Sequence, residues 1–533
     1  MTPHVAPPVA QPLSPLSASS RGLLDQRLQW AGLMLCFALI PVFFCAFEAM
    51  PFQDLPAHAG LIALRHRYET SAFDQQFLVL SPHIGPYSLF RFLGEHLMRA
   101  VGPLGAVRVL AMLPLFATPA ALLYMRRTLF GDASPLYGYI GLITTFGLMT
   151  LLGFASYQLG VAVMLVALTL WLRLLEAADT ESTALGRELA VVIAAPLVFV
   201  AHGHAFLLFL VLAGIASLVG PAPKRRLFRL RALVPALLLA AYVARAQRGS
   251  VVPQGSAPLN IPMTATFQGL ADKLSLLLTT TLMTRSGVDL LVGVLLWGFG
   301  VYAAVRTFQR LRRDNLRQAA DHHRRALLLG GAALLTGFFL LPHSVGWFGY
   351  VDGRLVPITL MLLLLGTDLE AIGAGLREFA QRAVPMGTIA VCVVALIAQS
   401  RFQAEADGYK EVLAKVPARA TLLNLPLDPN SDVFAAHPFI HYDKLVLTER
   451  DIVVSDMWFH QGSALYPTPK NPALRLPDDY SESNLKSIVW AGYQLADWDY
   501  VLIRTRPGAA QPQAPDALQL HEHRGGWWLF KRR

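Results

Sequence analysis

The fold is decided between residues 30 and 60, which read WAGLMLCFALIPVFFCAF (30–47) followed by EAMPFQDLPAHAG (48–60). The first segment has no charged side chain and is long enough to cross the hydrocarbon core of a bilayer. It is too long for the apolar part of a signal peptide, it lacks a convincing cleavage site, and Arg21 and Arg27 precede it. We therefore expect an uncleaved first membrane span, followed by a loop outside the membrane.

The composition extends this interpretation to most of the chain. Of 533 residues, 54% are hydrophobic and 15% are charged, against about 25% charged residues in soluble domains. The mean hydropathy is +0.45. A water-soluble globule could not bury so much apolar surface, and the three cysteines have neither disulfide-framework nor metal-site spacing. The remaining class is a polytopic membrane protein with room for one soluble domain.

Ten further apolar runs follow the first span, so we expect about eleven spans in a helical bundle. Between residues 188 and 220, the pattern fits either two short helices hinged at His202-Gly203-His204 or one long helix. The ten runs lie near 104–125, 136–153, 156–175, 188–201, 204–220, 232–247, 287–305, 326–342, 355–373 and 384–400.

Charge patterning predicts the orientation of the chain. Arginine and lysine cluster in alternate loops, most densely between residues 306 and 325, as the positive-inside rule expects of cytoplasmic loops. This explains the net charge of +10 better than nucleic-acid binding does, because no nucleic-acid motif is present. The N-terminus is then cytoplasmic in the inner (cell) membrane. Residues 48–103, 248–286, 343–354 and everything after 400 then face the periplasm or an equivalent exterior.

Three domains are expected: a disordered cytoplasmic tail (1–27), a transmembrane region (28–400) and an exterior soluble α/β domain (401–533). The tail is rich in proline, serine and alanine, which is typical of disorder. The last domain alternates polar turns with short apolar runs. Its pattern predicts strands at 420–425, 444–447, 452–454, 500–503 and 527–530, and a helix over 482–495.

The first exterior loop holds the most informative polar residues. Asp54 stands two residues before Pro56, which is typical of a helix N-cap, and an amphipathic helix should run from 55 to about 69. His58 lies one turn after Asp54, and a second amphipathic helix is expected over 87–101. Asp54 is either an ordinary cap or a general base whose pKa is raised by partial burial at the membrane boundary. His58 could equally be an interfacial polar residue.

These segments resemble the GT-C superfamily of integral-membrane glycosyltransferases. The resemblance is carried by PFQDLPAHAG (51–60), by IGPYSLFRFLGEHLMRAVGPLGAVRVLAMLP (84–114) and by GYVDGRLVPITLMLLLL (349–365), where an arginine opens a span. A soluble α/β domain after the last span also fits that superfamily. The expected fold is therefore a mostly α membrane bundle with a C-terminal soluble α/β domain.

The resemblance implies a reaction. Such enzymes move a sugar from a polyprenyl-phosphate donor to a glycan, lipid or protein acceptor on the exterior side. Asp54 matches the acidic residue that deprotonates the acceptor, with inversion at the anomeric carbon. Arg354 matches the late-loop arginine that holds the phosphate, although it could also be a topogenic charge. Many members carry two adjacent acidic residues in this loop, whereas here the nearest partner of Asp54 is Glu48.

Further polar residues are expected near the same face, where they could wall a substrate cleft. Each has an ordinary alternative as a structural or interfacial residue. Phosphate-loop, dinucleotide and zinc motifs are missing from the sequence, so we expect no cofactor and no metal, although a divalent ion fits some members of the superfamily. A lipid or glycan transporter and a non-catalytic envelope assembly protein are the competing functions. The additional substrate-binding candidates are His58, Glu48, His202, His204, His343, Tyr350 and Lys273.

Overall fold

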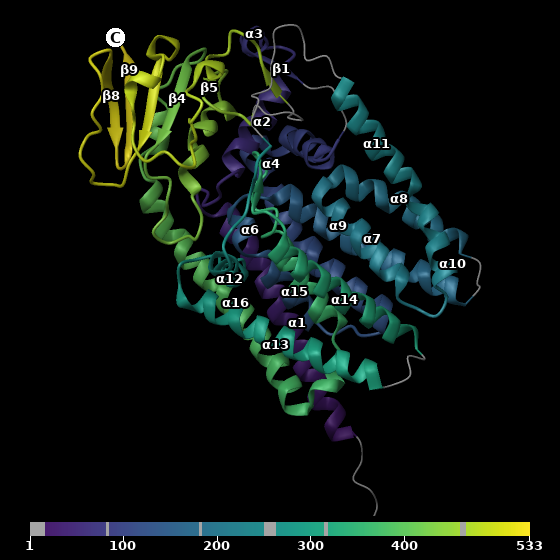
Figure 1. The fold of residues 1–533 in the computed structure, drawn as a ribbon. Coiled ribbons are helices and arrows are strands. Elements are labelled where there is room, and N and C mark those ends of the chain that lie inside the picture. Colours follow the sequence, from purple (N-terminus) through teal and green to yellow (C-terminus); the bar gives the residue numbers. More distant parts are fainter. Residues whose placement is uncertain (1–15, 81–84, 181–183, 250–262, 314–317, 459–464) are drawn as a thin grey trace, which may run out of the picture.

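The protein was analysed as a computed structural model, which describes residues 16–80, 85–180, 184–249, 263–313, 318–458 and 465–533. Helices make up most of these residues, and a small sheet lies near the C-terminus (Figure 1). Of the expected disordered tail, residues 1–15 lie outside the described residues, whereas α1 already begins at Leu16.

Within the described residues, six helical segments are long and apolar enough to cross a membrane. Two shorter apolar helices, α9 (Gly203–Leu218) and α15 (Leu355–Gly366), pack among them. The expected number of about eleven spans is not confirmed, but a multi-pass membrane protein is. The six segments comprise α1 (Leu16–Cys45), α4 (Ser88–Phe130), α7 (Ala155–Asp179), α10 (Pro223–Phe228) with η1 (Arg229–Leu233) and α11 (Val234–Gly249), α13 (Gly287–Arg313) and α16 (Ala374–Ala406).

Several expected spans are interrupted. The 188–220 region forms two helices, α8 (Leu185–Ala201) and α9, with His202 in extended conformation between them. Residues 136–153 form α5 (Leu136–Thr145) and the single turn α6 (Leu148–Leu151) rather than one span. The helix expected over 87–101 is present as the first part of α4, which bends at Gly102 (φ 71°). The remaining helix of the bundle is α14 (Ala319–Leu340).

The segments assigned to one side of the membrane by charge do gather at one end of the molecule. In the first loop, α2 (Leu55–Arg67), α3 (Ala72–Phe77) and β1 (Leu78–Leu80) follow one another, and β1 pairs with β6 (Leu465–Pro467) of the C-terminal domain. After α11, β2 (Ala265–Thr266) pairs with β3 (Ser344–Val345), and α12 (Leu270–Thr279) follows β2. In Figure 1 the sheet stands at one end and the start of α1 at the other.

The C-terminal domain holds a five-stranded sheet in the order β5-β4-β7-β9-β8. Strands β5 and β7 flank β4 in parallel, whereas β9 pairs antiparallel with both β7 and β8. Because α16 continues to Ala406, the domain begins a few residues after the expected boundary at 401. The strands are β4 (Thr421–Pro426), β5 (Val453–Val454), β7 (Tyr500–Arg504), β8 (Leu518–Arg524) and β9 (Trp527–Arg532).

Two local predictions in this domain are wrong. Residues 444–447 belong to the 3₁₀ segment η3 (Pro438–Thr448), not to a strand, and they pack against α2. A short apolar run cannot distinguish a strand from a buried helical turn by its pattern alone. Instead of the helix expected over 482–495, the chain forms turns and the short 3₁₀ segment η5 (Trp490–Gly492). A second 3₁₀ segment, η6 (Leu495–Asp497), begins at residue 495.

Candidate functional site

Asp54 is held at the start of α2 by a turn from another part of the chain. The backbone N–H groups of Gln53 and Asp54 donate to the carbonyl oxygens of Leu151 (2.8 Å) and Leu152 (3.3 Å). A Cβ atom at Gly153 (φ +79°) would stand 2.9 Å from the Asp54 Cβ, so only glycine fits this contact. The Asp54 side chain makes no capping hydrogen bond to α2. Its carboxylate is therefore available for another role.

Burial sets the protonation of Asp54. The side chain is 16% exposed, and burial raises its pKa from 3.8 to about 6. Three neighbours partly oppose this effect by favouring the charged form: His441 when its ring is protonated, Gln53 and Arg354. The Gln53 amide donates to Asp54 Oδ1 at 3.3 Å. At neutral pH Asp54 is mostly ionised, yet it accepts a proton more readily than an ordinary aspartate.

Arg354, the N-cap residue of α15, lies among aromatic rings, and its charge acts on Asp54. The side chain is buried, and its guanidinium carbon stands 3.9 Å from the ring centre of Phe348 and 4.4 Å from that of Phe154. Among the described residues, its Nε and Nη1 atoms have no hydrogen-bond partner. A buried cation with unpaired donors is costly, and a bound anion would supply the missing partners.

The loop before Arg354 is held by a buried ion-pair network. Asp352 is fully buried and accepts from Lys273 Nζ (2.8 Å) and from His343 Nδ1 (2.9 Å). Lys273 also donates to the carbonyl oxygens of Phe338 (2.6 Å) and Leu341 (2.8 Å), so its three donors are used within the protein. The structure therefore indicates that Lys273 and His343 order this loop.

Tyr350 belongs to the same loop and brings it to Asp54. Its backbone has a positive φ of 54°, which is strained for a tyrosine. Burial raises the pKa of its phenol, and the charges of Asp54 and Asp352 raise it further, so Tyr350 faces both carboxylates. Its ring centre lies 6.0 Å from that of Phe154. Tyr350 thus packs against Phe154, whose ring also contacts the Arg354 guanidinium.

His202 and His204 pack against the aromatic side chains around Arg354. Tyr157 donates a hydrogen bond to the Arg354 carbonyl oxygen, and its ring contacts both histidines at 5.2 and 5.9 Å. The His204 backbone N–H donates to His202 Nδ1 at 3.1 Å, which uses that ring nitrogen to cap α9. The His204 ring also faces Phe348 at 5.9 Å. Both histidines therefore support the aromatic wall around Arg354.

The two remaining candidates in the first loop lie in different surroundings. The His58 ring stands between Phe90 (5.0 Å) and Trp458 (4.9 Å), and burial together with His441 lowers its pKa to about 4. His58 is therefore neutral at pH 7. Glu48 is exposed and forms an ion pair with Lys410 in α17 (Tyr409–Leu413), away from the carboxylate of Asp54.

The C-terminal domain contributes one basic and one acidic neighbour of Asp54, and neither was predicted from the sequence. His441 in η3 places Nε2 at 3.8 Å from Asp54 Oδ1. Asp456 lies near enough for its charge to raise the pKa of Asp54. The only sequence signal was His441-Tyr-Asp-Lys444, a charged group inside an otherwise apolar run. The second acidic residue near Asp54 is thus Asp456, some 400 residues along the chain.

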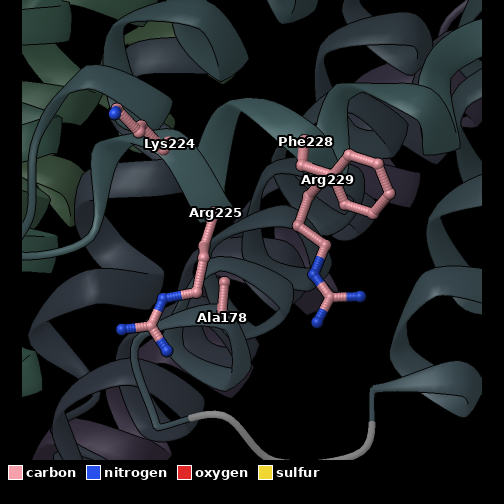
Figure 2. A pocket seen from close by; sticks show the side chains of 5 residues that line it. All are labelled: Ala178, Lys224, Arg225, Phe228 and Arg229. Atoms are coloured by element: carbon pink, nitrogen blue, oxygen red, sulfur yellow. The ribbon is translucent and has the colours of Figure 1, made fainter.

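A separate basic cavity lies at the other end of the bundle. It has a volume of about 640 Å³, and Figure 2 shows Lys224, Arg225 and Arg229 around it together with Phe228 and Ala178. Ala178 stands near the end of α7, about 35 Å along the helix from the end that meets Asp54. This cavity is therefore not part of the site. Among the residues that the structure describes, no group of three or more histidine, cysteine or acidic side chains could hold a metal.

The fold resembles solved structures at low sequence identity. ArnT from Cupriavidus metallidurans bound to undecaprenyl phosphate has a TM-score of 0.55 and 10% identity, over 94% of this chain and 97% of that chain. The archaeal oligosaccharyltransferase AglB from Archaeoglobus fulgidus, in complex with an inhibitory peptide and a dolichol-phosphate, has a TM-score of 0.49 and 12% identity, over 90% and 69%. Arabinofuranosyltransferase AftD from Mycobacteria has a TM-score of 0.45 and 14% identity, over 95% and 40%. No protein-family model and no curated protein matches the sequence. The likeness to ArnT confirms the GT-C-type fold.

Proposed function

We propose that this protein is a membrane glycosyltransferase that moves a sugar from a polyprenyl-phosphate donor to a glycan, lipid or protein acceptor. The observation that carries this proposal is the buried Arg354, which has guanidinium donors without a partner and whose charge acts on the carboxylate of Asp54. Phosphate oxygens would supply acceptors for these donors, because guanidinium–phosphate hydrogen bonds are charge-assisted and strong. The fold shared with ArnT, which was solved with undecaprenyl phosphate, supports a lipid phosphate as that anion.

The proposed reaction needs one base and one cation. Asp54 accepts the proton of the acceptor hydroxyl as its oxygen attacks the anomeric carbon of the donor sugar. The bond from that carbon to the phosphate oxygen breaks on the opposite side, so the configuration inverts. The electron pair stays on the lipid phosphate, and Arg354 stabilises the charge that develops there. In this proposal the carboxylate acts on the attacking oxygen and the guanidinium on the leaving phosphate.

The surroundings of both groups suit such a reaction. The rings of Phe154 and Phe348 pack against the guanidinium and exclude water, which strengthens its attraction for an anion. The basic cavity lies near the opposite end of α7 from the site, as expected if that end faces the cytoplasm. We therefore place the site and the C-terminal domain on the exterior side of the inner membrane, with the N-terminus in the cytoplasm.

Binding tests the arginine directly. The purified protein in detergent is titrated with undecaprenyl phosphate, and binding is followed by the rise in melting temperature. Arg354→Gln should weaken binding at least tenfold, or about 1.4 kcal/mol. Arg506→Gln, which changes an exposed arginine of the C-terminal domain, should leave binding unchanged. Equal binding by both variants would contradict the role of Arg354.

Turnover separates the enzyme from a transporter or an assembly protein. The protein is incubated with a panel of undecaprenyl-phosphate-linked pentoses and hexoses and a membrane extract as acceptor source. Release of undecaprenyl phosphate is measured. A glycosyltransferase consumes one of these donors, and Asp54→Asn should abolish that consumption. Binding of undecaprenyl phosphate without consumption of any donor would favour the transporter.

A further inference from the structure

We propose that His441, contributed by the C-terminal domain and oriented by Glu482, is the positioning residue that takes over the proton collected by Asp54. This inference rests on the proposed function, because it concerns the fate of the acceptor's proton. It also assigns a part of the reaction to the C-terminal domain, which supplies both His441 and Glu482.

The orientation of the His441 ring follows from its two contacts. Nδ1 lies 2.9 Å from Glu482 Oε2, so this nitrogen carries the hydrogen and donates it to the carboxylate. Nε2, the other ring nitrogen, faces Asp54 Oδ1 at 3.8 Å, where it can accept a proton when the ring is neutral. That separation exceeds a hydrogen bond by about 0.8 Å, and catalytic contacts are commonly long before the substrate binds.

Glu482 is in turn firmly held. Lys444 Nζ donates to both of its oxygens at 2.6 and 2.5 Å, and the hydroxyls of Ser455 and Tyr480 each donate to Oε1 at 3.1 Å. Burial alone would raise the pKa of Glu482, but Lys444 and His441 hold it down to about 2. Glu482 therefore remains a carboxylate and fixes the orientation of the His441 ring, as the buried aspartate orients the histidine in hydrolase triads.

Packing between α2 and η3 sets the distance from His441 to Asp54. A Cβ atom at Gly60 would stand 2.9 Å from the Lys444 carbonyl oxygen and 2.9 Å from Leu447 Cδ1, so the two elements touch through a glycine. Tyr442 donates a hydrogen bond to the Met50 carbonyl oxygen at 2.8 Å, which fixes the chain just before Asp54. The docking of the C-terminal domain thus positions the base.

The proposed relay moves the acceptor's proton first to Asp54 and then to His441. The acceptor O–H bond breaks and its proton moves to an Asp54 oxygen while the new glycosidic bond forms. The proton then passes from Asp54 to His441 Nε2, which restores the Asp54 carboxylate and leaves an imidazolium hydrogen-bonded to Glu482. His441 returns this proton to water after the products leave. The titratable groups that face His441 are Asp54, Glu482, Asp443, Lys444, Asp456 and His58.

The test uses donor turnover in the full-length protein with the panel described above. His441→Gln should lower kcat by about tenfold to a hundredfold while KM for the donor stays unchanged. His437→Gln is the matched control, since His437 is exposed in the same segment and contacts Asn430.

A second variant separates a relay from a structural role. His441→Ala should be rescued by added imidazole, which a purely structural histidine would not show. Should these variants fail to fold, Gly60→Ala, which moves α2 from η3 and keeps the His441 side chain, must show the same loss of kcat. An unchanged kcat in His441→Gln or Gly60→Ala overturns the inference while the proposed function stands. Absence of donor turnover in the unaltered protein refutes the proposed function itself.

Discussion

Replacing Asp54 by asparagine should abolish transfer and make the protein more stable at neutral pH. The carboxylate is held in a buried site that favours its protonated form, so its ionisation at pH 7 works against folding. Asparagine keeps the size of the side chain and removes the charge. The two effects have a common origin, because the burial that creates the base also costs stability.

The magnitude follows from the pKa. The rise from 3.8 to about 6 corresponds to about 3 kcal/mol at pH values above 6, where both the folded and the unfolded protein are ionised. Since the folded-state pKa is raised, this penalty shrinks below pH 6 and nearly vanishes by pH 4. For 533 residues, the unfolding entropy is about 1.1 kcal/mol per degree. Removing the penalty of about 3 kcal/mol should therefore raise the melting temperature of Asp54→Asn by about 3 °C.

The assay is thermal unfolding in detergent at pH 8 and pH 4, beside the turnover measurement. Asp54→Asn should melt about 3 °C above the unaltered protein at pH 8 and at nearly the same temperature at pH 4. Asp74→Asn is the control: Asp74 is buried in the same loop and pairs with Arg67 at 2.7 Å, so its loss should lower the melting temperature without abolishing turnover. A lower melting temperature for Asp54→Asn at pH 8 would refute the reasoning.

Four further outcomes are expected. Because burial raises the pKa of Asp54 to about 6, kcat/KM should rise with pH through that value and fall at pH 5 to about a tenth of its plateau; a flat profile from pH 5 to 8 would contradict it. Arg354→Lys should weaken undecaprenyl phosphate binding about tenfold, since lysine keeps the charge but loses the fork and the ring stacking; equal affinity would show that charge alone suffices. Asp352→Asn leaves Lys273 buried without its carboxylate and should cost about 3–5 kcal/mol, seen as a lower melting temperature. Gly60→Ala should cost about 1–3 kcal/mol through the clash with the Lys444 carbonyl oxygen, and unaltered stability would mean that α2 is free to shift.

Features that depend on local chemistry could be predicted from the sequence. The apolar runs identify a membrane protein, because the bilayer demands long uncharged helices. The Asp54-Leu-Pro56 pattern correctly predicted that α2 begins at Leu55. The alternation of basic loops assigned to one side of the membrane the segments that pair as β1 with β6 and as β2 with β3. The pairing of Asp54 with Arg354 came from resemblance, and their proximity is consistent with the charge that each exerts on the other.

The failures share one cause. Residues 444–447 have the composition of a strand, yet contact with α2 holds them in a 3₁₀ segment. Glu48, six residues from Asp54, is the nearest acidic residue in the sequence, but its side chain forms an ion pair with Lys410. Periodicity records which face of an element is apolar, but it carries no information about which distant element covers that face.

The sequence by itself determined the membrane class and the position of Asp54 at the start of a helix, since these follow from hydropathy and capping along a short stretch of chain. Only the tertiary structure decided that Arg354 is buried with unpaired donors and that His441 and Asp456 stand beside Asp54. The electrostatics of a buried carboxylate depend on desolvation and on charges a few ångströms away, and both are set by packing between segments hundreds of residues apart.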